Sequence, residues 1–149
     1  MILLVSSVFP PEPVVSATIG RDMAEALSEN CEVMVVTPKP TRPLGFSFKK
    51  LSTGNQKFKH FVLNSYTYPE SRLFGRLRES YSFGKHVVDY IKKYKAEIQC
   101  VYIHSWPLVA PYKIVKASKK YSLPTIIHIV DIYPEALSDK LLFLKKSSS

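Results

Sequence analysis

A titratable side chain, a hydroxyl and an indole follow one another directly after a short apolar run. The run is Cys100–Ile103, and His104, Ser105, Trp106 and Pro107 come after it. Such a run is typical of a strand buried on both faces of a parallel sheet, and a proline suits the first turn of a helix. We therefore predict that His104 and Ser105 lie in a turn at the carboxyl end of a strand, the edge where α/β sheets bind ligands. The alternative is that His104 only caps a helix or satisfies a buried backbone group.

Two other segments are predicted to reach the same edge of the sheet. A proline-rich loop follows the apolar start of the chain and ends at Ser16, Ala17 and Thr18. Ser16 is a good helix N-cap, because its hydroxyl can accept from the free amides of the first turn, and a helix N-terminus favours phosphate. The second segment follows another apolar run and contains Asp131 and Glu135. These two carboxylates are either acceptors for sugar hydroxyls or a helix-start pair stabilised by the dipole.

Several other kinds of chemistry are disfavoured by the motifs. The chain has no glycine-rich dinucleotide fingerprint and no Walker A sequence, which argues against NAD and against a nucleotide triphosphatase. A metal site is not expected, because His104, His128 and Asp131 include no closely spaced pair of ligands. A Ser105 nucleophile is disfavoured because no G-x-S-x-G elbow surrounds it. We expect no cofactor.

The positive charge is unevenly distributed. The formal net charge is +9, and no acidic residue occurs over 33–69. Beyond this span, Arg72, Arg76 and Arg78 are interleaved with leucine and phenylalanine. A mixture of cations and apolar side chains suits an anionic membrane surface, and free phosphates or ordinary solvation are the alternatives. Nucleic acid is not expected as a partner, because no recognised binding motif is present.

The whole chain alternates between strand and helix patterns. The predicted strands are 1–6, 32–36, 58–66, 98–103 and 125–130, and the predicted helices are 17–28, 71–94, 108–121 and 134–144. The alternation predicts one three-layer α/β domain with a mostly parallel sheet and a right-handed first crossover. The apolar face of the first helix is expected to comprise Ile19, Met23, Ala26 and Leu27.

A few single residues qualify this outline. The helix over 71–94 could break at Gly75 or Gly84. Cys31 and Cys100 are expected to be reduced core residues of a cytosolic protein. No apolar run approaches the roughly 18 residues needed to span a bilayer.

Three stretches together resemble a known family. They are 32–37, 101–108 and 123–137, and the last contains Asp131, Pro134 and Glu135 in an Asp-Ile-Tyr-Pro-Glu-Ala sequence. The chain resembles the amino-terminal half of retaining glycosyltransferases of the GT-B fold, family four. The similarity is greatest to bacterial transferases of surface polysaccharides that carry N-acetylfucosamine-type sugars, which commonly show Asp-Leu-Trp-Pro-Glu-Ser at this place.

The resemblance implies the Rossmann-like, acceptor-binding half of a two-domain enzyme, with the nucleotide-sugar domain absent from these 149 residues. His104 falls where the family has a histidine beside the transferred sugar. Ser16 and Ala17 stand where many members carry a glycine pair facing the donor phosphates.

We therefore expect residues 1–149 to belong to a transferase that moves a sugar from a nucleotide-sugar to a lipid-linked or glycan acceptor in bacterial surface polysaccharide synthesis, including lipopolysaccharide and capsule. The expected location is cytoplasmic, on the inner face of the membrane. The expected partners are the donor, the acceptor, anionic lipid and the carboxyl-terminal domain of the same protein. This half by itself is expected to be inactive. The alternative is a non-catalytic α/β binding module that recruits a partner subunit or a membrane-bound acceptor.

Overall fold

The predicted alternation of strands and helices is confirmed by the computed structural model. The structure describes residues 1–43, 45–48, 56–68, 70, 72–104 and 109–129. Within them the elements in chain order are β1 (Ile2–Val5), α1 (Val15–Ser28), β2 (Val33–Pro38), β3 (Lys59–Leu63), α2 (Leu73–Tyr94), β4 (Cys100–His104), α3 (Val109–Lys120) and β5 (Thr125–His128). The predicted helix over 134–144 lies outside the described residues.

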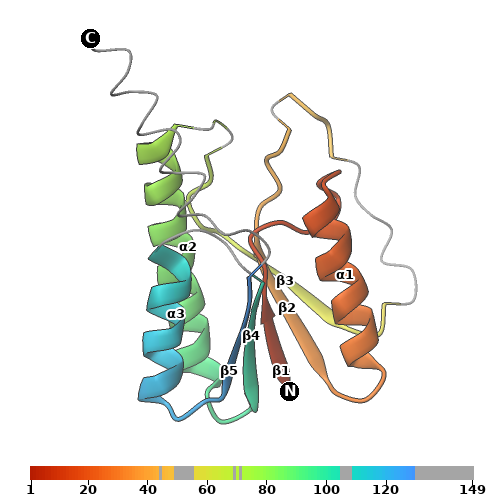
Figure 1. The fold of residues 1–149 in the computed structure, drawn as a ribbon, viewed down its shortest axis with the longest axis vertical. Coiled ribbons are helices and arrows are strands. Elements are labelled where there is room, and N and C mark those ends of the chain that lie inside the picture. Colours follow the sequence, from red (N-terminus) through yellow and green to blue (C-terminus); the bar gives the residue numbers. More distant parts are fainter. Residues whose placement is uncertain (44, 49–55, 69, 71, 105–108, 130–149) are drawn as a thin grey trace.

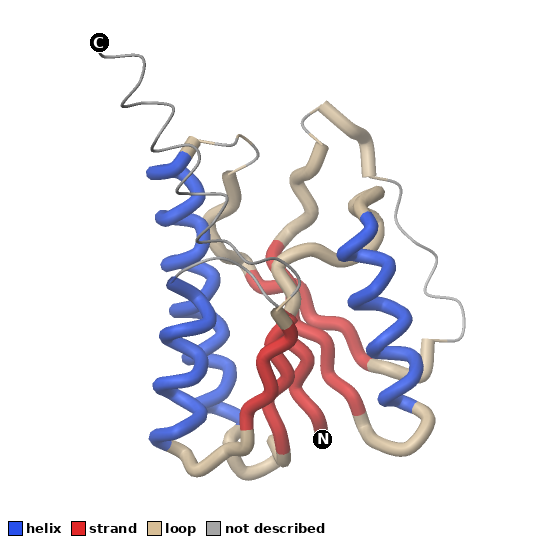
Figure 2. The backbone as a smooth tube through the Cα atoms, in the orientation of Figure 1, coloured by secondary structure: helices blue, strands red, loops and turns tan. Residues whose placement is uncertain are grey.

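The five described strands form one sheet, and every neighbouring pair in it is parallel. Their order is β3-β2-β1-β4-β5. α1 covers one face, and α2 and α3 cover the other (Figure 1). Figure 2 shows the strands as a central layer between α1 and the α2–α3 pair. The prediction of a three-layer α/β domain with a mostly parallel sheet is therefore confirmed.

β1 and β4 are followed by helices on opposite faces of the sheet. The two strands are neighbours, yet the next helix after β1 is α1 and the next after β4 is α3, in the opposite layer. In open α/β sheets, ligands bind beyond the carboxyl ends of two strands that diverge in this way. The topology thus singles out one point on the sheet edge, which we call the switch point.

Side chains of the strands alternate between two cores. Leu3, Val5 and Ile103 pack with α2 and α3, whereas Leu4 and Val35 pack on the α1 side. All five side chains are almost completely buried. Burial of an aliphatic side chain of this size stabilises the fold by roughly 1.5–3 kcal/mol. These well-packed strands therefore fix the positions of the residues at their carboxyl ends.

Small residues form the face of α1 that meets the sheet. Ala17, Gly20 and Ala24 are buried, whereas Ile19 is 37% exposed and Ala26 is exposed. The predicted apolar face is therefore wrong at Ile19 and Ala26. Small side chains let a helix lie close to a sheet, and this spacing is decided by tertiary packing rather than by the hydrophobicity of the helix itself.

α2 is one continuous helix of 22 residues, so the two glycines do not break it. Gly75 faces the ring of Tyr68, and Gly84 faces α3. A Cβ added at Gly84 would lie 2.8 Å from the Cα atom of Ala110, closer than packed side chains approach. The glycine at this position lets the two helices come together.

The outer strands and one cysteine are exposed to solvent. Four of the five residues of β3 are exposed, as are Ile126 and Ile127 of β5. β3 and β5 are the two edges of the described sheet, so each has a neighbour on one side only. Cys100 is partly buried, but Cys31 is exposed in the turn between α1 and β2, so its prediction as a core residue is wrong. No helix in the described part of the chain is both long and apolar enough to cross a membrane.

Candidate functional site

His104 is the last residue of β4, where it pairs with His128 of β5, so its prediction in the turn after the strand is wrong by one residue. It lies at the switch point beside the end of β1. Val5 pairs with Ile103 in the sheet, which places Ser6 next to His104. The Ser6 hydroxyl donates to the carbonyl oxygen of Val8 at 2.6 Å, and its Oγ lies 3.3 Å from Nδ1 of His104. Both side chains are buried, with His104 only 2% exposed. Neighbouring strands therefore hold this imidazole in a fixed position.

The other ring nitrogen of His104 is unpaired within the described residues. Nε2 is buried and has no hydrogen-bond partner there, although buried polar groups in native proteins are nearly always paired. The ring of His128 lies 5.1 Å away between centroids, because the two residues are register partners in β4 and β5. Burial lowers the pKa of His104, and the nearby His128 lowers it further. The imidazole is therefore neutral near pH 7 and can accept a hydrogen bond or a proton.

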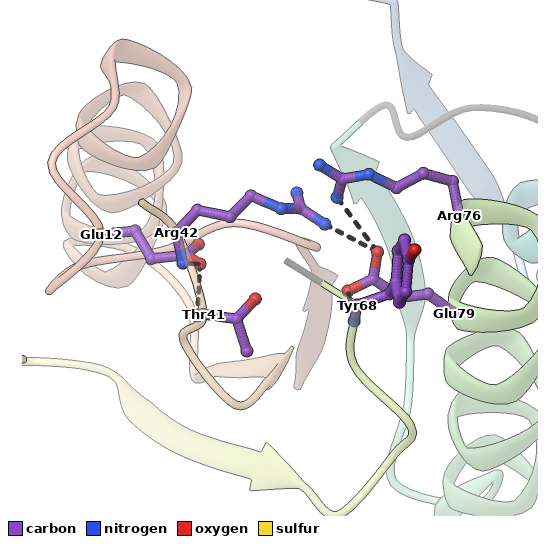
Figure 3. A network of polar contacts seen from close by, with 6 residues as sticks. All are labelled: Glu12, Thr41, Arg42, Tyr68, Arg76 and Glu79. Carbon is purple, nitrogen blue, oxygen red and sulfur yellow. Dashed lines mark hydrogen bonds and ion pairs between the residues drawn. The ribbon is translucent and has the colours of Figure 1, made fainter. Parts of the chain in front are cut away.

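A second polar cluster connects the loops at the β2–β3 side of the same edge (Figure 3). Glu12, in the loop after β1, is buried. Its Oε1 accepts from the backbone N–H groups of Thr41, at 2.8 Å, and Arg42, at 3.0 Å. Burial raises the pKa of Glu12, and the N–H of Thr41 and the charge of Arg76 oppose that rise. The carboxylate thus fixes the segment that follows β2 to the segment that follows β1.

Glu79 on α2 is the centre of this cluster. One carboxylate oxygen, Oε2, accepts from Arg42 at 2.7 Å and from Arg76 at 3.2 Å, and the other accepts from the backbone N–H of Tyr68 at 3.0 Å. Burial raises the pKa of Glu79, the Tyr68 N–H and Arg76 lower it, and the charge of Glu12 raises it. The loops after β1, β2 and β3 are thereby connected to α2. We call this set of contacts, made by Glu12, Thr41, Arg42, Tyr68, Arg76 and Glu79, the edge network.

The N-cap of α1 is not the residue predicted from the sequence. The helix begins at Val15, and its N-cap, Val14, makes no side-chain capping bond. Ser16 therefore lies inside the first turn, and its prediction as the N-cap is wrong. Ala17 is buried and Thr18 is exposed, because residues one apart on a helix point in different directions. Their contact with a substrate stays a prediction.

The three predicted surface arginines have different surroundings. Arg72 is 82% exposed and lies 3.1 Å from Glu70, and Arg78 lies over the ring of Tyr66, 4.4 Å from its centroid. Arg76 instead points into the edge network, as Figure 3 shows. Their contact with a membrane stays a prediction. Arg76 also has a structural role, because it pairs with Glu79. Ser105, Asp131 and Glu135 lie outside the described residues.

Three residues of the site, Ser6, Glu12 and Glu79, are missed by the sequence analysis. Glu12 stands between two prolines, and Glu79 follows Arg76 at the i+3 spacing of a helix. That spacing signals a pair but not its burial. Ser6 gives no local signal, because its partner is 98 residues away.

In the part of the chain that the structure describes, no group of three histidine, cysteine or acidic side chains could hold a metal ion.

The sheet order and its two helical layers define a Rossmann-like α/β domain. A ugt transferase from Siraitia grosvenorii, crystallised in complex with UDP, has a similar structure, with a TM-score of 0.54 at 15% sequence identity. The similarity covers 87% of this chain and 28% of that one, so the chain spans less than a third of that transferase. No protein-family model and no curated protein sequence matches the chain.

Proposed function

We propose that this chain is the acceptor-binding half of a retaining glycosyltransferase that takes a sugar from a nucleotide-sugar. The observation that supports it most is His104, a buried neutral imidazole at the switch point of a fold shared with a UDP-bound transferase. Its Nε2 has no partner within the described residues. A hydroxyl group of a sugar would satisfy this nitrogen, as buried polar atoms require.

In the proposed reaction the acceptor hydroxyl replaces the nucleoside diphosphate at the anomeric carbon of the donor. The bond from that carbon to the diphosphate oxygen breaks, a bond to the acceptor oxygen forms, and the hydroxyl proton passes to the departing diphosphate. His104 would accept a hydroxyl hydrogen bond at the reacting centre. Positive groups that stabilise the departing diphosphate would come from the carboxyl-terminal domain. The donor is a substrate, and no cofactor is required.

We also propose that the acceptor is lipid-linked or a glycan, and that the protein works on the cytoplasmic face of a bacterial membrane in surface polysaccharide synthesis. The support is the first turn of α2, where Phe74 is 85% exposed and Leu73 is 53% exposed beside Arg72. Apolar and cationic side chains on one exposed turn suit the interface of an anionic bilayer. The net charge of +9 acts in the same direction.

Transfer assays on this chain and on the product of the complete reading frame test the proposal. With a panel of sugar nucleotides and lipid or glycan acceptors, followed by mass spectrometry, we expect no turnover by the 149 residues alone, because they match only 28% of the UDP-bound transferase. Turnover is expected from the complete product. If the complete product shows acceptor binding without turnover, the chain is a binding module instead.

Substitution of His104 tests its role. In the complete protein His104→Ala should lower turnover by about 100-fold or more, as for a positioned polar group at a reacting centre. His86→Ala is the matched control, because His86 bonds only to the Ser82 carbonyl of its own helix among the contacts described. Unchanged turnover together with a large loss of stability would show that His104 is a structural histidine.

A further inference from the structure

The Ser6 hydroxyl group can donate its hydrogen bond to one partner only. Its oxygen lies 2.6 Å from the carbonyl oxygen of Val8. Two oxygen atoms that present only lone pairs repel each other at this distance, so a hydrogen must lie between them. The carbonyl has none to give. The single hydrogen of the Ser6 hydroxyl therefore points at Val8.

This direction decides which nitrogen of His104 carries the proton. The Ser6 oxygen can only accept toward His104, since its one hydrogen is already donated. Nδ1, 3.3 Å away, must then be the donor. A neutral imidazole has one N–H, so Nε2 is left with a lone pair. In water, neutral histidine mostly carries its proton on Nε2, so the site reverses the usual preference.

We propose that Ser6 is a positioning residue that holds His104 as its Nδ1–H tautomer, so that Nε2 is presented to a ligand as a hydrogen-bond acceptor. Nε2 is buried and has no partner within the described residues, so the lone pair is not used by the fold there. A lone pair needs a donor, and we assign that donor to a hydroxyl group of the ligand. This last step rests on the proposed function, whereas the tautomer does not.

The Ser6 side chain is itself fixed by its surroundings. The residue follows β1, its side chain is fully buried, and its oxygen lies close to the face of Gly20 on α1. Both partners of the hydroxyl are also buried, Val8 in the loop after β1 and His104 at the end of β4. A ring fixed in this way loses little freedom when a ligand binds, which favours affinity.

The tautomer can be read directly from the nitrogen NMR spectrum of the ¹⁵N-histidine-labelled chain above the pKa of the imidazoles. We expect the His104 signals, assigned by their loss in His104→Gln, to show the proton on Nδ1. In Ser6→Ala, Nδ1 loses its acceptor, and the proton should move to Nε2 in most molecules. Ser28→Ala is the matched control, because it removes another serine-to-carbonyl bond, 2.7 Å long, at the far end of α1.

A proton on Nε2 in the unsubstituted chain would overturn the proposal, as would an unchanged tautomer in Ser6→Ala. If Ser6→Ala does not fold, the spectrum of the unsubstituted chain still decides. In the complete protein Ser6→Ala should lower kcat roughly 10-fold or more, as for other partners that orient a functional side chain, with the KM for the nucleotide-sugar little changed. Failure of the transfer assay with Nδ1–H intact would contradict the proposed function but not the role of Ser6.

Discussion

Three buried titratable side chains near the carboxyl edge of the sheet respond to pH in opposite senses. Burial lowers the pKa of His104 below its ordinary 6.5, and raises the pKa of Glu12 and Glu79 above 4.5. The histidine favours its neutral form in the fold, so its stabilising contribution is present above pH 6.5 and is lost as the pH falls. The glutamates contribute most below pH 4.5 and lose this as the pH rises through their folded-state pKa values.

The histidine effect can be isolated by substitution. We expect His104 to make the free energy of unfolding, measured with urea, smaller at about pH 5.5 relative to about pH 7.5, because the unfolded chain gains a proton on His104 that the folded chain resists. In His104→Gln this difference should be smaller, while the overall stability is also reduced. Its neighbour His128 is left in place in both proteins. An identical pH dependence in the two proteins would contradict the lowered pKa of His104.

At the scale of elements, the loops after β1, β2 and β3 are held together by the side chains of the edge network and not by backbone hydrogen bonds of a helix or sheet. The side chains of Glu79, Arg42 and Arg76 are at most 23% exposed, so removal of one charge leaves the others buried and unbalanced. Glu79→Gln should therefore lower the free energy of unfolding by about 2–4 kcal/mol. Glu25→Gln breaks the exposed pair with Arg21 on α1 and should change it by less than about 0.5 kcal/mol. Equal effects in urea unfolding would mean that the network contributes little.

The contact between α2 and α3 depends on the absence of one side chain. Gly84→Ala would place a methyl group against the backbone of Ala110, which cannot move as a flexible side chain could. We expect a loss of about 1–3 kcal/mol in the free energy of unfolding, typical of overpacking. Lys85→Ala, at the next and exposed position of α2, is the control and should be nearly neutral. If Gly84→Ala raises the melting temperature, the two helices have more room than the structure gives them.

At the scale of the whole molecule, some of the positive charge is paired with acidic side chains. Within the acid-free span, Arg42 belongs to the edge network and Lys59 pairs with Glu32 at 2.7 Å. The start of α2 combines one exposed cation, the N-cap Arg72, with the exposed side chains of Leu73 and Phe74, at the end of the helix beyond the carboxyl edge of the sheet (Figure 1). We therefore place the proposed lipid contact at this turn rather than over the whole basic span.

Co-sedimentation with vesicles tests the proposed lipid contact. The chain should bind vesicles that contain phosphatidylglycerol, less strongly as salt rises. Arg72→Glu with Arg78→Glu should weaken binding markedly, since each basic residue near a membrane contributes on the order of 1 kcal/mol, and Phe74→Ser should weaken it further. Arg76 is kept, because its loss would disturb the edge network. Lys119→Glu with Lys120→Glu, at the end of α3, makes the same change in charge. An equal effect of this control, or binding that ignores lipid charge, would contradict the assignment.

The sequence by itself determined the fold class and the position of His104. Apolar runs and helical periods are local patterns, and their alternation permits few arrangements other than a parallel sheet with helices on both faces. A residue directly after a buried strand must then lie at the carboxyl edge, which is why His104 could be placed there. The role of Gly84 in α2 could not be predicted from the sequence, because it depends on its contact with Ala110 in another helix.

Only the tertiary structure decided which polar groups meet. Ser6 and His104 are 98 residues apart, and Arg42 and Glu79 are 37 apart. No local spacing relates such residues, and their contact follows from the strand order and from the loops that the sheet brings together. Burial is decided in the same way, because it depends on what covers a residue. Arg72 and Arg76 are alike in sequence, yet one is exposed to solvent and the other balances two buried carboxylates.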